Sequence, residues 1–130
     1  MENNDIIEVY HFNMSKAVQN GKNLYFIRPQ ADDVLELAQQ GLYVKVADVK
    51  TQDLEQAFEL TNHIDKDWQS NKEVSALTNK ARSTSVGDLC VKNEEVFVVI
   101  SIGFEKMPDE LKFLLDNSAK QDKKYKKLVS

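Results

Sequence analysis

The chain of 130 residues is 42% hydrophobic, which supports one buried core of ordinary size and leaves no material for a second domain. No apolar run approaches the roughly 20 residues of a membrane helix, so we expect no membrane contact. The single cysteine, Cys90, excludes an internal disulfide and a zinc site built on paired cysteines. The first five residues are acidic and polar, unlike a signal peptide, and predict a cytoplasmic protein.

The net charge of −4 is unevenly distributed along the chain. Residues 119–130 are basic, with one acid, Asp122, against Lys120, Lys123, Lys124, Lys126 and Lys127. The first 118 residues contain 12 basic and 20 acidic side chains, a net charge of −8. The basic end is typical of a solvated tail, and contact with nucleic acid or an acidic partner through its lysines is the alternative.

The first third of the chain predicts two strands. Residues 6–12 are rich in strand formers, and residues 23–28 form a second such segment. Pro29 ends this second segment, because proline cannot donate to a central strand ladder. Between the two, either a helical turn over residues 16–20 or an Asn20-Gly21 hairpin turn fits the sequence.

Helix and strand patterns alternate in the middle of the chain. Residues 32–40 have a helical period that Gly41 ends. Residues 42–49 alternate as a strand with one more polar face. A second helix follows, with Thr51 expected as its N-cap and an inward apolar stripe over residues 54–64.

A polar connection over residues 65–84 interrupts this regularity. Such a stretch of about 20 residues is unusual in a small domain and is more often functional or flexible than idle. Its single tryptophan, Trp68, either caps the core beneath the connection or stands exposed as an anchor for a partner.

A β-hairpin is predicted in the C-terminal half. Its strands are residues 89–92 and 96–102, joined by a polar loop at residues 93–95. The second strand is β-branched and aromatic on both faces, which favours a strand covered on both sides. Gly87 and Gly103 bracket the hairpin and fit backbone positions with positive φ.

After the hairpin, Pro108 begins a helix expected over residues 109–117. Together these elements predict an α+β fold with a mixed sheet of about five strands and three to four helices. We expect residues 1–118 to form a single domain and residues 119–130 to form a basic, flexible tail.

Standard catalytic signatures are absent from the sequence. It has no glycine-rich phosphate loop, nucleophile elbow or His-Glu-x-x-His motif, so we predict no catalytic residue, cofactor or metal site. His11 and His63 are expected to be structural or on the surface. Cys90 lies among strand-forming apolar residues, which favours a buried, unreactive thiol.

Arg82 and the hydroxyl residues that follow it have two interpretations. The guanidinium and the hydroxyls can hold an anion or a carboxylate near the turn at Gly87. Alternatively, Arg82 pairs with Asp88 while Ser83 and Ser85 satisfy backbone groups before the strand. We favour the second interpretation.

This segment also carries a resemblance. Arg82-Ser83-Thr84-Ser85-Val86-Gly87-Asp88, Gly103-Phe104, Thr61-Asn62 and Trp68 resemble residues shared by small phage- and plasmid-encoded bacterial proteins of unknown function. The resemblance spans roughly residues 42–107. It implies an accessory gene of a mobile element and carries no activity with it.

Our leading hypothesis is a non-enzymatic accessory protein that binds a host macromolecule, most simply a host protein. The candidate binding residues lie at the end of the second helix, in the polar connection and before the hairpin: Asn62, Trp68, Asn71, Arg82, Ser83, Ser85 and Asp88. An acidic nucleic-acid mimic that inhibits a DNA-directed enzyme is one alternative, based on the −8 body. The other is a small ligand-binding domain or hydrolase using the Arg82–Asp88 turn.

Overall fold

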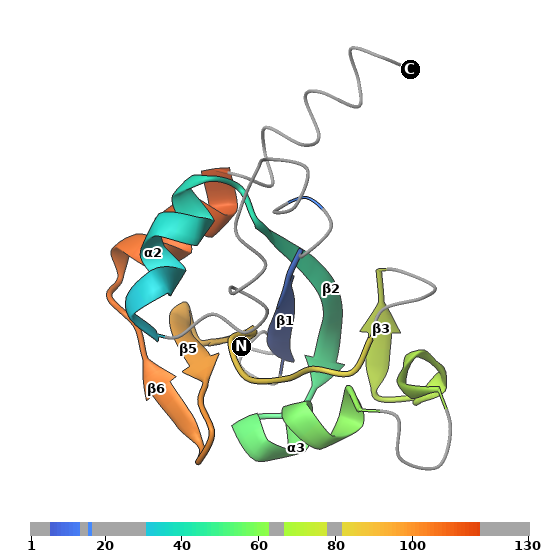
Figure 1. The fold of residues 1–130 in the computed structure, drawn as a ribbon. Helices are drawn as coiled ribbons and strands as arrows, with labels where there is room; N and C mark the ends of the chain where they lie inside the picture. The colour runs from blue at the N-terminus through green and yellow to red at the C-terminus, as the bar shows by residue number, and fades with distance from the viewer. Residues whose placement is uncertain (1–5, 14–15, 17–30, 63–66, 78–81, 118–130) are drawn as a thin grey trace, which may run out of the picture.

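The computed structural model describes residues 6–13, 16, 31–62, 67–77 and 82–117. Within these residues the chain forms a six-stranded sheet with helices packed on it (Figure 1). The strands are β1 (Ile6–Phe12), β2 (Tyr43–Lys50), β3 (Val74–Ala76), β4 (Leu89–Lys92), β5 (Glu95–Val99) and β6 (Phe104–Lys106). The helices are α2 (Ala31–Gln39), α3 (Leu54–Leu60), the 3-10 helix η2 (Trp68–Ser70) and a helix at residues 110–117.

The strand order is β3-β2-β1-β4-β5-β6, and each neighbouring pair is antiparallel. β1 lies in the middle, since it pairs with β2 along its whole length and with β4 on its other side. The α+β class and the hairpin in the C-terminal half are therefore confirmed. The sheet has six strands instead of about five, and its described pairings are antiparallel where we expected a mixed sheet.

The two strands that sequence analysis missed are the edge strands β3 and β6. Each has three residues, too few to show a period of two. Their backbones become strands by pairing with β2 and β5. The strand expected at residues 23–28 lies outside the described residues, as do most of the turn expected at 16–20 and the whole tail.

The β4–β5 hairpin differs from its predicted form at both ends. Its loop has two residues, Asn93 and Glu94, with φ of 52° and 70°, because Glu95 already pairs with Lys92. β5 ends at Val99, and the strand expected to reach residue 102 is wrong there, because the Ile100 amide donates to the Gly103 carbonyl at 3.1 Å and turns the chain. Positive φ is confirmed at both bracketing glycines.

The helices follow the sequence pattern closely. α2 and the helix at residues 110–117 lie where we predicted helices. α3 also lies there but ends at Leu60, short of the expected residue 64, because Thr61 caps it by bonding back to carbonyls of the last turn. The N-cap of α3 is Asp53, whose carboxylate accepts from the Glu55 amide at 3.0 Å, and not the expected Thr51. The Thr51 hydroxyl instead accepts from the Asp53 amide at 3.1 Å, so it supports the turn that precedes the helix. None of the described helices is long or apolar enough to cross a membrane.

The two faces of the sheet bury two separate hydrophobic clusters. Figure 1 shows α2 beside the helix at residues 110–117, with α3 well apart from both. The cluster under α2 and residues 110–117 includes Phe12, Leu37, Leu89, Val98 and Leu111. The cluster under α3 and η2 includes Ile7, Val9, Ala57, Trp68 and Cys90. The sheet is therefore the middle layer, and side chains alternate between the two clusters along β1 and β4.

Candidate functional site

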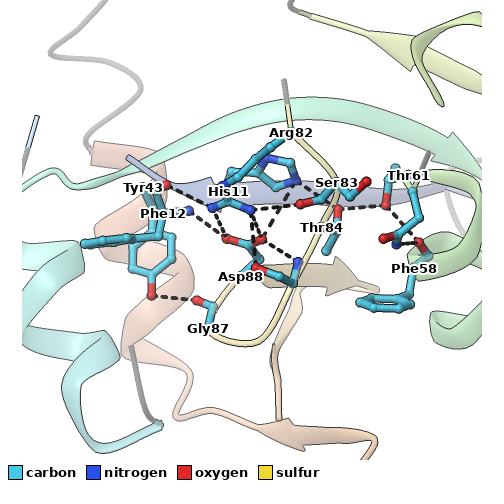
Figure 2. A network of polar contacts seen from close by, with 12 residues as sticks. His11, Phe12, Tyr43, Phe58, Thr61, Arg82, Ser83, Thr84, Gly87 and Asp88 are labelled. Carbon is cyan, nitrogen blue, oxygen red and sulfur yellow. Dashed lines mark hydrogen bonds and ion pairs between the residues drawn. The ribbon is translucent and has the colours of Figure 1, made fainter. Parts of the chain in front are cut away.

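A buried carboxylate, Asp88, is the centre of the polar network in Figure 2. Each of its oxygens accepts two hydrogen bonds. Oδ1 accepts from the Phe12 amide at 2.8 Å and from Arg82 at 2.9 Å. Oδ2 accepts from the Ser85 amide at 2.8 Å and from Arg82 at 2.6 Å. The carboxylate thus joins the end of β1 to the segment that leads into β4.

The Arg82 guanidinium faces inward although 46% of its side chain is exposed. It binds Asp88 in a bidentate pair, and it also donates to the Phe12 carbonyl at 3.1 Å and the Ser83 carbonyl at 3.0 Å. A weaker contact reaches the Ser85 hydroxyl at 3.4 Å. The hydrogen bonds to Asp88 raise the pKa of Arg82. This geometry is the internal ion pair that we favoured from the sequence.

His11 anchors a buried line of hydroxyl groups beside this pair (Figure 2). Its Nε2 lies 2.8 Å from the Thr84 hydroxyl, which donates to the Thr61 hydroxyl at 2.8 Å. Thr61 in turn donates to the Ala57 carbonyl at 2.8 Å. Because each hydroxyl has one proton, this order makes His11 Nε2 the donor to Thr84. The line connects β1 to the end of α3.

Burial lowers the pKa of His11 to about 4. Asp88 opposes this shift, since its Oδ2 lies 3.9 Å from Nε2, while Arg82 reinforces the shift. The imidazole is therefore neutral near pH 7, and the structural role expected for His11 agrees with its burial.

Trp68 is completely buried. Its indole nitrogen donates to the Arg82 carbonyl at 2.9 Å, and its ring meets His11 edge-on with 6.2 Å between centroids. Of the two interpretations of this tryptophan, the cap on the core is confirmed and the exposed anchor is wrong. A side chain this large gains more from burial under a polar loop than from exposure.

The remaining candidate residues, Asn62 and Asn71, stabilise the C-terminal end of α3. Asn62 donates its amide to the Phe58 carbonyl, and Asn71 donates to the Leu60 carbonyl at 2.8 Å, so both satisfy carbonyls in the last turn of α3. The structure thus brings the seven candidate residues together where α3, η2 and residues 82–88 meet. They are linked chiefly to one another and to the backbone.

Sequence analysis missed several members of this network. Phe12 contributes only its amide and carbonyl, so its side chain carries no signal of the contact. Tyr43 donates its hydroxyl to the Gly87 carbonyl at 2.8 Å, and burial raises the pKa of this phenol. The alternation of residues 42–49 predicted only that Tyr43 lies on the more polar face of its strand. Thr61 and Thr84 were noticed as part of the resemblance, but nothing in the sequence pairs them.

The described residues offer little for metal or thiol chemistry. No group of three or more His, Cys, Asp or Glu side chains in that part of the chain is placed to hold a metal ion. Burial, with a smaller contribution from Asp88, raises the pKa of the Cys90 thiol to about 12. The thiolate is the reactive form of cysteine, so this thiol is unreactive at neutral pH.

A surface groove of about 420 Å³ lies between α3 and the turn that joins β5 to β6. We call it the α3 groove, and its lining residues are Glu55, Phe58, Glu59, Val99, Ile100, Ser101, Gly103 and Phe104. The polar network adjoins it, because Val99 exchanges backbone hydrogen bonds of 2.9 Å with Gly87 and Asp88. A second hollow of about 330 Å³ is charged, but its Lys45 already pairs with Asp48 at 2.9 Å and Glu8 at 3.4 Å.

Comparisons with protein-family models, with curated proteins and with solved structures found no match.

Proposed function

We propose that this chain is a non-enzymatic accessory protein of a phage or plasmid and that it binds a host protein. The observation that carries the proposal is the internal use of the Arg82–Asp88 pair. Both Asp88 oxygens and both terminal nitrogens of Arg82 are engaged by the chain itself. A polar network that is saturated in this way serves to shape a surface, whereas a catalytic or anion-binding site keeps groups directed at its ligand.

The surface shaped by the network includes the solvent-facing part of the candidate residues. Arg82 is partly exposed, and Asn62, Ser83 and Ser85 are half-buried around it. Trp68, Asn71 and Asp88 support this surface from below through the contacts described above. The origin in a mobile element rests on the resemblance alone.

A small-ligand or hydrolase function would need the Arg82–Asp88 turn to offer free donors or a nucleophile. The guanidinium donors instead point at Asp88, Phe12 and Ser83, and His11 has its Nε2 committed to Thr84. These contacts are the reason we rank this alternative behind protein binding.

An acidic nucleic-acid mimic remains the second candidate, and the charge distribution favours it. The first 118 residues have a net charge of −8, and three of the described lysines, Lys45, Lys106 and Lys112, are paired with carboxylates. Partner binding by a mimic should weaken steeply as salt is raised, because many separate charges contribute. Binding that changes little with salt would remove this candidate.

The test is capture of partners from bacterial lysate by the tagged full chain and two variants. Ser85→Arg adds a large cation on the proposed surface, next to Arg82. Ser75→Arg makes the same change on β3, where the exposed Ser75 lies between residues whose side chains pack under α3. We expect one stoichiometric host protein with the natural chain and with Ser75→Arg, and its loss with Ser85→Arg. Circular dichroism confirms that both variants fold.

Retention of no protein by the natural chain would overturn the proposed function. Retention of the same protein by both variants would place the binding surface elsewhere on the molecule.

A further inference from the structure

The α3 groove has an apolar floor and an acidic wall. The floor consists of buried and half-buried side chains, namely Phe58, Val99, Ile100 and Phe104. Glu55 and Glu59 line the groove from α3, where both are exposed and lie one helical turn apart. None of the described residues that line the groove is basic. The wall is therefore a local concentration of negative charge beside an apolar surface.

An exposed isoleucine extends this apolar surface. Ile102 is 91% exposed, and its neighbours Ser101 and Gly103 both line the groove. The turn that carries Ile102 is well defined, since Gly103 has φ of 90° and its carbonyl accepts from the Ile100 amide at 3.1 Å. A large side chain held out in water next to an apolar groove is typical of an interaction site.

The buried polar network fixes the two sides of the groove relative to each other. The hydrogen bond between Thr84 and Thr61 ties the network to the end of α3, just beyond Phe58. The backbone bonds of Val99 with Gly87 and Asp88 tie it to the end of β5. The groove is consequently formed before any partner arrives, which reduces the ordering cost of binding.

Building on the proposed function, we propose that the partner that covers the surface around Arg82 also extends into the adjoining α3 groove, where it places a basic segment that carries a large apolar side chain. The apolar side chain would cover the floor beside Ile102, and the basic groups would face Glu55 and Glu59. The net charge of −8 in the first 118 residues favours the approach of a basic partner.

Two other occupants fit the groove less well. A second copy of the chain in a two-fold contact would place the same acidic patch against itself, and like charges would repel. A nucleic acid would bring its phosphates to the carboxylates of α3, which is unfavourable for the same reason. A basic protein segment satisfies both the charge and the apolar floor.

The test measures binding of a labelled synthetic peptide of alternating lysine and leucine to the full chain by fluorescence anisotropy. Peptides of alternating glutamate and leucine, and of alternating lysine and serine, are the matched probes. The groove variant is Glu55→Lys with Glu59→Lys. Its control is Asp32→Lys with Glu36→Lys on α2, which has the same spacing, exposure and charge change but lies over the other face of the sheet.

We expect the lysine–leucine peptide to bind the natural chain more tightly than either matched peptide. The groove variant should weaken this binding by about tenfold or more, and the α2 control by no more than about threefold. Ile102→Ser should weaken binding of the lysine–leucine peptide without changing that of the lysine–serine peptide. Equal losses in the two double variants, or equal affinity for the two lysine peptides, would overturn the groove assignment.

The captured host partner separates a failure of the groove from a failure of the proposed function. Loss of the partner with the groove variant and its retention with the α2 control would support both the groove assignment and the proposed function. A partner retained equally by both double variants would overturn the groove and leave the binding function standing. Absence of any captured partner would overturn the proposed function. The peptide measurements would then be the only test of the groove assignment.

Discussion

At the scale of single residues, the molecule depends on one buried charge. Asp88 has 1% of its side chain exposed and accepts four hydrogen bonds, two of them from Arg82. Removing a charge from water is costly, and here the cost is offset by pairing and by backbone donors. The main effect of the pair is therefore to hold β1, residues 82–88 and β4 in one relative arrangement.

Asp88→Asn should destabilise the fold by about 3 kcal/mol or more. The asparagine amide would meet donors that now point at a carboxylate oxygen, and Arg82 would lose its counter-charge. Urea unfolding measures the change. Asp116→Asn, which alters an exposed pair with Lys112, is the control and should change the unfolding free energy by no more than about 0.5 kcal/mol. Equal effects of the two substitutions would contradict the central role of Asp88.

His11 should make stability depend on pH between about 6.5 and 4. Its pKa falls from 6.5 to about 4 in the folded chain, so the unfolded chain binds a proton first as pH decreases. The contribution is fully present above pH 6.5 and is lost as the pH falls to about 4, by roughly 3 kcal/mol at most.

The measurement for His11 is urea unfolding across this pH range with the natural chain and with His11→Gln. Glutamine does not titrate and retains an N–H donor for Thr84, so its profile reports the remaining groups. The natural chain should lose more stability than the variant on acidification. Parallel profiles would mean that His11 does not carry the pH dependence.

At the scale of elements, local pattern and tertiary pairing contribute differently. α2, α3 and β2 have enough residues for their hydrophobic period to identify them, and the structure confirms all three. β3 and β6 have three residues each and exist because β2 and β5 provide partners. The N-cap of α3 was misplaced by two residues because Thr51 and Asp53 both belong to capping residue types.

The β4–β5 turn should be improved by glycine at Glu94. This residue has φ of 70°, a left-handed conformation that costs a side chain about 1 kcal/mol and costs glycine little. Glu94 also pairs with Lys112 at 3.1 Å, so the proper comparison is between Glu94→Gly and Glu94→Ala, which both remove that pair. We expect the glycine variant to be more stable by about 1 kcal/mol in thermal or urea unfolding. A more stable alanine variant would contradict the assigned backbone conformation.

At the scale of the whole molecule, the sheet separates two buried clusters, and each of them includes side chains from β1, β2 and β4. Cys90 lies in the middle of the sheet, opposite Val9 of β1 and Phe97 of β5. Its side chain belongs to the cluster under α3 and η2. Exposing it requires α3 and η2 to move away from the sheet or the strands to separate, so its accessibility reports opening of this cluster and not fraying of a chain end.

Labelling of Cys90 by a thiol reagent should therefore be slow in native buffer and should accelerate as urea approaches the unfolding midpoint. When closing is faster than labelling, the free energy of opening from labelling should be no larger than that from urea unfolding, because opening of α3 and η2 alone is enough to expose the thiol. An Ile102→Cys variant provides the control, since its added thiol lies at a position that is 91% exposed and should react at once. Rapid labelling of Cys90 in the natural chain would contradict the buried position.

The sequence by itself determined the elements whose identity depends on local chemistry. A helical period with Gly41 as its stop signal placed α2, and Pro108 with the apolar stripe after it placed the helix at residues 110–117. Strand-forming runs placed β1 and the β4–β5 hairpin. The two flanking glycines indicated left-handed backbone, since a residue without Cβ tolerates it. The same local reasoning favoured the Arg82–Asp88 pair, because the two residues are only six apart.

Only the tertiary structure decided what surrounds that pair. The contact between His11 and Thr84 joins residues 73 positions apart, and the Phe12 amide reaches Asp88 across 76 positions. No sequence pattern predicts the partner of a backbone amide or of a single hydroxyl group. These partners are decided by the order in which the strands pair. The burial of Trp68 and the joining of α3 to the β5–β6 turn as a groove depend on that order as well. Local chemistry selects the elements, and long-range pairing in the sheet decides which of their side chains meet.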